Sequence, residues 1–176
     1  MCGIAGILSK KDENVVPLVG TMLHCMVNRG PDGAGLIADD HIVKTNSISA
    51  MQVKFKNVSG KSALGHTRLA IVGGTCGAQP FSSCDGRILL EHNGEIYNYK
   101  KIRERLAKRH KFSTMTDSEV IVHLIEDNLR KNSLVGAIKK TVAELDGVYA
   151  LAIQDKKTGE TILVRDRIGV RQLYYA

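Results

Sequence analysis

The order of strand-like and helix-like segments most constrains the fold of this chain. Short or alternating apolar runs predict strands, and apolar residues at three- and four-residue spacing predict helices. The predicted strands are residues 2–8, 34–38, 41–54 (split by a turn), 62–71, 86–92, 147–155, 160–165 and 172–176. The predicted helices are residues 14–28, 98–109, 117–131 and 134–144. Strands grouped on both sides of a block of helices predict an α+β fold on antiparallel sheets, because βαβ winding would alternate the two.

Size and composition predict one globular domain, residues 1–176. No apolar stretch approaches the ~20 residues of a membrane-spanning helix, and the N-terminus lacks the features of a signal peptide. We therefore expect a cytoplasmic protein that does not bind membranes. The last predicted strand runs to the final residue, which suggests a C-terminal continuation that is absent from this sequence.

Charge and spacing argue against several kinds of partner. The net charge is +7. However, the densest run of basic residues surrounds Ile102 and Leu106, which are at helical spacing, so these basic residues are expected on the solvent-exposed face of a surface helix. Zinc-finger spacing, a helix-turn-helix pattern and abundant aromatic residues are missing, so we do not expect nucleic-acid binding. No phosphate-binding glycine motif is present. The cysteines follow no paired metal-binding spacing, so we expect no metal.

Cys2 carries the strongest chemical signal. If Met1 is removed, one residue holds both a thiol and a free α-amine, whose reference pKa values are about 8.5 and 7.7–8.0. The amine can then accept the thiol proton, directly or through a water molecule, so one residue supplies both nucleophile and base. Cys2 taken alone is equally compatible with the start of a buried strand, so its role depends on the rest of the chain.

Asn93 and Gly94 form a second candidate site. After the strand predicted at 86–92, these two residues would suit an ordinary hairpin turn. However, the residues that follow favour a helix over a return strand. A side-chain carboxamide next to a glycine N–H also offers two donors to a developing oxyanion. Both interpretations remain open at this stage.

Charged residues in otherwise apolar or turn-rich segments complete the set. Arg68 is costly in an apolar strand unless it is paired, either with a protein carboxylate such as Asp32, Glu95 or Asp117, or with a substrate carboxylate. Asp117 could cap the helix at 117–131, bind an ammonium group, or do both. Glu95, close to Asn93 in sequence, could likewise bind an ammonium group.

Together these groups fit one type of substrate. A cation with two anions suits a zwitterionic amino acid, and a thiol with oxyanion donors suits acyl transfer. The joint hypothesis is attack on the side-chain amide of an amino acid, for which glutamine is the obvious candidate.

Six runs of residues resemble the class II glutamine amidotransferase domain, an N-terminal-nucleophile hydrolase. They are Cys2-Gly3-Ile4, Arg29-Gly30-Pro31-Asp32-Gly33, His92-Asn93-Gly94-Glu95-Ile96-Tyr97-Asn98, Thr116-Asp117-Ser118-Glu119-Val120-Ile121, Leu145-Asp146-Gly147-Val148-Tyr149-Ala150 and Arg165-Asp166-Arg167-Ile168-Gly169-Val170. The runs occur in the family's order over nearly the whole chain. The resemblance implies a four-layer α-β-β-α sandwich of two antiparallel sheets.

The resemblance also implies a role for each matching residue. The Cys2 thiol is the nucleophile and its α-amine the base, and the oxyanion hole comes from the Asn93 side chain and the Gly94 N–H. Arg68 binds the α-carboxylate of glutamine. The α-ammonium group of glutamine is bound by Asp117 and Glu95. Backbone groups of Ile71 and Val72 line the pocket.

Within the family, the chain is most similar to the glutaminase domain of asparagine synthetase. The Gly77-Ala78-Gln79-Pro80 segment and the loop beginning at Arg29 carry this similarity, whereas Thr67 is more typical of the glucosamine 6-phosphate branch. Ammonia is then expected to serve asparagine synthesis through a synthetase domain or subunit. That absent part, and not glutamine hydrolysis, would need ATP and Mg²⁺.

Alternatives to the asparagine branch remain. The chain could be a separate amidotransferase subunit for glutamate or glucosamine 6-phosphate synthesis. It could also be a catalytically silent regulatory module with the same fold, which a retained Met1 would favour because the Cys2 nitrogen would then be an amide.

Overall fold

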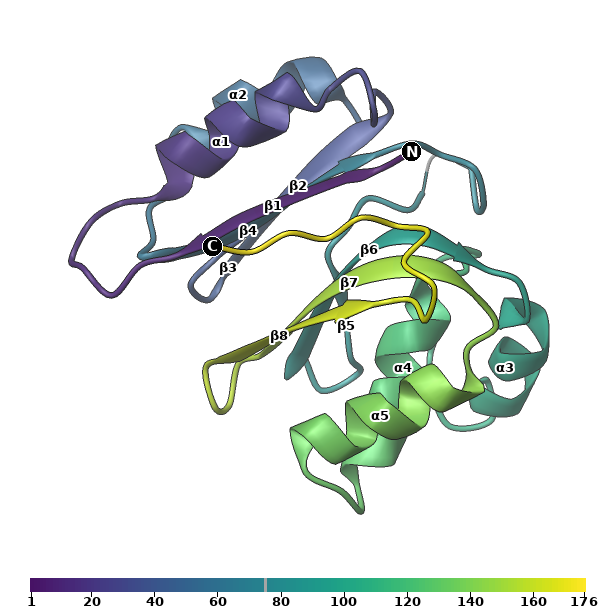
Figure 1. Cartoon of the computed structure of the whole chain (residues 1–176). Helices are drawn as coiled ribbons and strands as arrows, with labels where there is room; N and C mark the ends of the chain where they lie inside the picture. Colours follow the sequence, from purple (N-terminus) through teal and green to yellow (C-terminus); the bar gives the residue numbers. More distant parts are fainter. Residues whose placement is uncertain (75) are drawn as a thin grey trace. The chain divides into compact units, whose positions relative to one another are not determined.

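The computed structural model describes residues 1–74 and 76–176, which form two compact units, Met1–Pro80 and Phe81–Ala176. Each unit consists of one antiparallel sheet and its helices (Figure 1).

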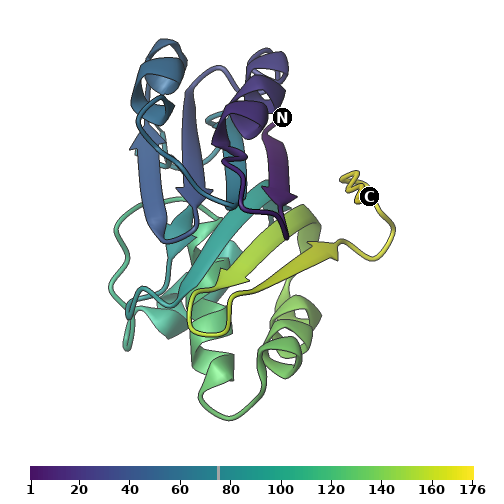
Figure 2. The same ribbon diagram turned by 90° about the vertical axis from the view of Figure 1, so that its left-hand side faces the viewer.

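The first unit is a four-stranded sheet in the order β1-β4-β2-β3. Its strands are β1 (Gly3–Leu8), β2 (Gly33–Ala38), β3 (His41–Thr45) and β4 (Ser62–Arg68). One face of this sheet is covered by α1 (Val16–Cys25) and α2 (Met51–Phe55), with a 3₁₀ turn at Ile48–Ala50 before α2 (Figures 1 and 2). The two helices bury apolar side chains against the sheet. The opposite face of the sheet is not covered by these helices.

The second unit is a four-stranded sheet in the order β5-β6-β7-β8. Its strands are β5 (Phe81–Ser82), β6 (Ile88–Ile96), β7 (Gly147–Asp155) and β8 (Glu160–Arg165). Its helices are α3 (Tyr99–Leu106), α4 (Glu119–Leu129) and α5 (Leu134–Glu144). A core that includes Ile121 and Ile125 of α4 and Leu90 of β6 joins the helices to one face of the sheet.

Most predicted elements are present, and three predictions were wrong. Residues 48–55 are helical instead of continuing a strand, because Met51 and Phe55, four residues apart, are both buried in the core beside α1. The strand predicted at 86–92 continues to Ile96, paired with β7 along its whole length. Residues 172–176 form no strand, and Tyr174 and Tyr175 are 80% and 88% exposed.

The two later helices differ in their N-caps. The N-cap of α4 is Ser118, whose side chain makes no capping bond. α5 is capped by Ser133, whose hydroxyl accepts a hydrogen bond from the Gly136 N–H at 3.3 Å. Among the helices of the described residues, none combines the length and hydropathy required to span a bilayer.

Candidate active site

Cys2 lies just before β1, at the end of the β1–β4 pair. Gly3 pairs with Thr67, so Cys2 and Arg68 occupy the next position on the two strands. The Gly3 and Thr67 side of the pair faces Met26 after α1, and neighbouring residues of a strand alternate faces. Cys2 and Arg68 therefore both belong to the face of the first sheet that its helices leave uncovered.

The Cys2 sulfur is held by the chain that follows β4. It accepts a hydrogen bond from the Leu69 N–H at 3.4 Å and lies 3.9 Å from the Leu69 carbonyl oxygen. The side chain is half-buried. A thiolate is stabilised by such a backbone donor, so the sulfur is both accessible and positioned for nucleophilic attack.

Arg68 is buried at the end of β4, with 4% of its surface exposed. Its Nη2 donates to the carbonyl oxygens of Val72 and Gly74 at 3.2 and 2.7 Å. Its Nη1 is buried with no hydrogen-bond partner among the described residues. The ion pair with Asp32 considered above is not formed among the described residues of the first unit, and one arm of the guanidinium remains available to a carboxylate.

A glycine-rich loop positions the Cys2 and Arg68 end of the sheet. A Cβ on Gly30 would lie 2.4–2.6 Å from backbone atoms of Thr67 and Arg68, so only glycine allows this approach. The Asp32 carboxylate accepts from the Ala70 N–H at 2.7 Å. These contacts fix the segment after β4, on which the predicted pocket residues Ile71 and Val72 lie. Ile71 is 57% exposed.

In the second unit, Asn93 and Gly94 lie within β6, opposite Ala150 and Tyr149 of β7. The hairpin-turn interpretation is therefore wrong. A Cβ on Gly94 would lie 2.0 Å from the Val148 carbonyl oxygen, so the close strand pairing requires glycine. The even-numbered residues Leu90 and Ile96 pack against the helices, which places Asn93 on the opposite face of this sheet.

The Asp117 side chain binds the backbone near the end of β6, next to Glu95. The Asp117 carboxylate accepts from the Ile96 N–H at 2.9 Å and is 6% exposed. Glu95, the residue before Ile96, has 38% of its side chain exposed. The candidate residues thus fall in both units: Asn93, Gly94, Glu95 and Asp117 lie in the second, and Cys2, Arg68, Ile71 and Val72 lie in the first.

Arg171 is a neighbour of this second group that sequence reasoning missed. Its Nη2 lies 3.8 Å from Glu95 Oε1. The Asp166 carboxylate accepts from the N–H groups of Val170 and Arg171 at 2.9 and 3.0 Å and so fixes the loop. The run beginning Arg165-Asp166 was part of the family pattern, but it gave no indication of a partner for Glu95.

His92 lies on the helix-facing side of β6 and is neutral. Burial, together with the Arg171 charge, lowers the pKa of His92 to about 3. Its Nδ1 lies 2.8 Å from the Ser118 hydroxyl. This contact links β6 to the start of α4, just after Asp117, and supports a structural role for His92.

Glu91 is a buried acid on the same strand as Asn93. It is completely buried, and neither carboxyl oxygen has a hydrogen-bond partner among the described residues. Burial raises the pKa of Glu91 well above its ordinary value. The folded chain therefore retains a proton at a pH where the unfolded chain, with a Glu pKa of about 4.3, has lost it.

We expect Glu91→Gln to increase stability more as the pH rises. Above the unfolded pKa the unfolded state binds fewer protons, so wild-type stability falls by about 1.4 kcal/mol per pH unit until the folded pKa is reached. Glutamine has no proton to lose. Thermal unfolding at pH 5 and pH 8 should show a growing advantage for the variant, whereas exposed Glu104→Gln should show none. An advantage that does not change with pH would contradict a neutral Glu91.

Two solved structures share the fold over almost the whole chain. Glutamine phosphoribosylpyrophosphate amidotransferase from B. subtilis matches with a TM-score of 0.80 and 28% identity, over 97% of this chain and 38% of its own. A structure of the allosteric regulatory enzyme of purine biosynthesis matches with a TM-score of 0.79 and 29% identity, over the same shares. The predicted α+β class, of the N-terminal-nucleophile hydrolase type, is confirmed.

Sequence comparisons place the chain in a family. The glutamine amidotransferase domain model matches residues 52–176. A Methanocaldococcus jannaschii protein, provisionally named asparagine synthetase (glutamine-hydrolyzing) 1, is 38% identical over 99% of this chain and 30% of its own length. Glutamine–fructose-6-phosphate aminotransferase of Methanococcus maripaludis is 33% identical over 97% of this chain and 30% of its own length. The chain belongs to the class II glutamine amidotransferase family, and it spans less than a third of these two relatives.

Proposed function

We propose that this chain hydrolyses glutamine to glutamate and ammonia through a thioester on Cys2. The observation that supports this most is a sulfur held by the backbone and a buried guanidinium at the same end of the β1–β4 pair, where Nη1 of that guanidinium has no hydrogen-bond partner among the described residues. Family membership supplies the substrate class. The reaction needs no metal or organic cofactor, and a cytoplasmic location is part of the proposal.

The first step forms the thioester. The α-amine of Cys2, free once Met1 is removed, accepts the thiol proton while sulfur attacks the glutamine side-chain carbonyl carbon. The resulting oxyanion accepts hydrogen bonds from the Asn93 carboxamide and the Gly94 N–H. When this intermediate collapses, the carbon–nitrogen bond breaks and the ammonium group of Cys2 returns the proton to the departing nitrogen. Ammonia leaves.

The second step regenerates the enzyme. The amine accepts a proton from water as the water oxygen attacks the thioester carbon. Glutamate forms when the carbon–sulfur bond breaks, and sulfur recovers the proton. Throughout, Arg68 holds the α-carboxylate, while Asp117 and Glu95 bind the α-ammonium group. Ile71 and Val72 line the pocket with backbone groups.

We further propose that the ammonia serves asparagine synthesis from aspartate and ATP. The likeness to the M. jannaschii protein supports this acceptor, with a synthetase domain or subunit contributing ATP and Mg²⁺ binding. Relatives that are glutamine–fructose-6-phosphate aminotransferases, at 33–36% identity, favour amino-sugar synthesis as the second candidate. Supplying the purified chain with each type of synthase and measuring amide or amino-sugar formation separates the two.

We expect Arg68→Ala to raise the KM for glutamine strongly. Loss of a buried charged partner costs about 2–5 kcal/mol, which corresponds to about 30-fold or more in kcat/KM. Arg68→Lys should recover only part of this, because lysine retains the charge but not the planar fork. Steady-state ammonia release tests both variants, with circular dichroism as the control for folding. An unchanged KM in a folded Arg68→Ala protein would assign Arg68 a structural role.

A further inference from the structure

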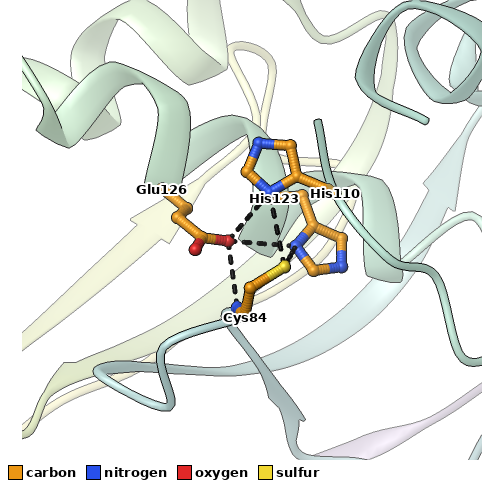
Figure 3. Close-up of side chains that lie close together, drawn as sticks. All are labelled: Cys84, His110, His123 and Glu126. Carbon is orange, nitrogen blue, oxygen red and sulfur yellow. Dashed lines mark hydrogen bonds and ion pairs between the residues drawn. The ribbon is translucent and has the colours of Figure 1, made fainter. Parts of the chain in front are cut away.

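Four side chains that glutamine hydrolysis does not use converge in the second unit. They are Cys84, His110, His123 and Glu126, and one potential ligand atom from each lies within 4.8 Å of all the others (Figure 3). Thiol, imidazole and carboxylate groups are the ligands that proteins offer to zinc. The cluster therefore needs an explanation separate from the active site.

Three separate segments of the fold supply these side chains. Cys84 lies in the turn between β5 and β6, where the Gly86 N–H donates to the Ser83 carbonyl. His110 follows α3. His123 and Glu126 are three residues apart on α4, a spacing that places both on one helix face.

Burial distinguishes the cluster from an accidental group of surface residues. The side chains of His110 and His123 are only 1% and 2% exposed, and that of Glu126 is 15% exposed. Cys84 lies at the exposed edge. The site is thus nearly closed on the protein side, with its opening at the thiol.

Four of the six distances between the ligand atoms lie near those of tetrahedral zinc coordination. With typical zinc–ligand bond lengths, a sulfur and a nitrogen should lie about 3.6 Å apart, and a nitrogen and an oxygen about 3.4 Å apart. Cys84 Sγ lies 3.5 Å from His110 Nδ1 and 3.7 Å from His123 Nδ1. Glu126 Oε2 lies 3.0 Å and 3.2 Å from the same two nitrogens. Small outward movements of the carboxylate would complete the geometry.

An outer carboxylate orients one of the two imidazoles. Asp127 Oδ1 lies 2.8 Å from His110 Nε2. Glu119 Oε1 lies 3.9 Å from His123 Nε2, beyond hydrogen-bond distance, and that nitrogen has no hydrogen-bond partner among the described residues. A carboxylate on the far nitrogen is the usual partner of a metal-binding histidine, because it fixes the tautomer that directs a lone pair at the metal. If the Nε2 proton of His110 is donated to Asp127, the lone pair of Nδ1 points at the cluster, as metal binding requires.

We infer that Cys84, His110, His123 and Glu126 form a zinc site in this chain. Magnesium and calcium are excluded as natural occupants, because they require mainly oxygen ligands and the cluster offers one carboxylate. Four protein ligands leave no open position, so the ion is structural. It ties the β5–β6 turn and the segment after α3 to α4.

Metal analysis of the purified full chain tests this inference. We expect one zinc ion per chain after zinc loading and removal of excess metal, with nanomolar or tighter affinity. Co²⁺ added to chelator-treated protein should give a thiolate charge-transfer band and tetrahedral visible bands, which zinc then displaces. Zinc should also raise the Tm of the metal-free protein.

Three variants identify the ligands. Cys84→Ser, at an exposed position where folding is not at risk, should lose the cobalt thiolate band and the zinc-dependent rise in Tm. Cys25→Ser, also exposed but on α1, should retain both. Asp127→Asn, a positioning change, should weaken zinc affinity by about 10–100-fold with the cobalt band still present.

Two results would overturn the inference. Zinc binding weaker than about 10 μM by the folded wild-type chain would show that the cluster is only a hydrogen-bonded group with a protonated imidazole. Equal zinc affinity of Cys84→Ser and wild type would show that the metal binds elsewhere. Neither result would affect the proposed glutaminase chemistry.

Discussion

Replacing Cys2 with alanine is expected to abolish ammonia release from glutamine. Alanine retains the α-amine but removes the atom that forms the thioester, so only uncatalysed or weak water attack remains. Loss of a nucleophile in a comparable covalent mechanism lowers kcat by about 10⁴-fold or more. A coupled assay for ammonia and glutamate with purified protein measures the effect. Cys2→Ser should also be severely impaired, because a hydroxyl is a far weaker nucleophile than a thiol.

The matched control for this prediction is Cys25→Ala. Cys25 is an exposed thiol at the end of α1 and should be dispensable for hydrolysis. Equal ammonia release by wild type and Cys2→Ala would rule out the thioester mechanism. It would favour the alternative in which the chain is a regulatory module that retains only the fold.

The second large effect is expected for Asn93→Ala, which should lower kcat by about 10²–10³-fold and leave KM nearly unchanged. Removing one oxyanion donor costs about 2.7–4 kcal/mol in the transition state. Binding of the ground-state amide depends little on that donor. Single-turnover and steady-state kinetics with glutamine separate these two contributions.

Two controls make the Asn93 prediction specific. Asn93→Asp retains the shape but replaces the donor with a negative charge, so it should be at least as impaired as alanine. Exposed Asn46→Ala should behave as wild type. A change in KM alone, with kcat preserved, would reassign Asn93 from oxyanion stabilisation to substrate binding.

The sequence predicted the long periodic elements well. An arginine in an apolar strand needs a negatively charged partner, so the sequence alone suggested that Arg68 binds either a protein carboxylate or a substrate carboxylate. Local preference failed where packing decided the outcome. The second part of the strand predicted at 41–54 is helical, and Met51 and Phe55 are buried in the core on that helix. In sequence, Asn93-Gly94 suits a turn as well as an oxyanion hole, and pairing with β7 extends the strand through both residues.

Other features depend on contacts between distant segments and could not be predicted. Cys84 and His110 are 26 residues apart, and Cys84 and His123 are 39 apart, so no ligand spacing is visible. Only His123 and Glu126 are close in sequence. The ion pair of Arg171 with Glu95 likewise arises from the loop that Asp166 holds after β8.

The central claim is that Cys2, with its own free amine, is the nucleophile. Reaction of the active protein with 6-diazo-5-oxo-norleucine, a reactive glutamine mimic, followed by peptide mass mapping, tests both parts together. We expect a single adduct on a peptide whose first residue is Cys2. Labelling at Cys25, Cys76 or Cys84 instead, or an adduct on Cys2 with Met1 still attached in protein that releases ammonia, would contradict the account.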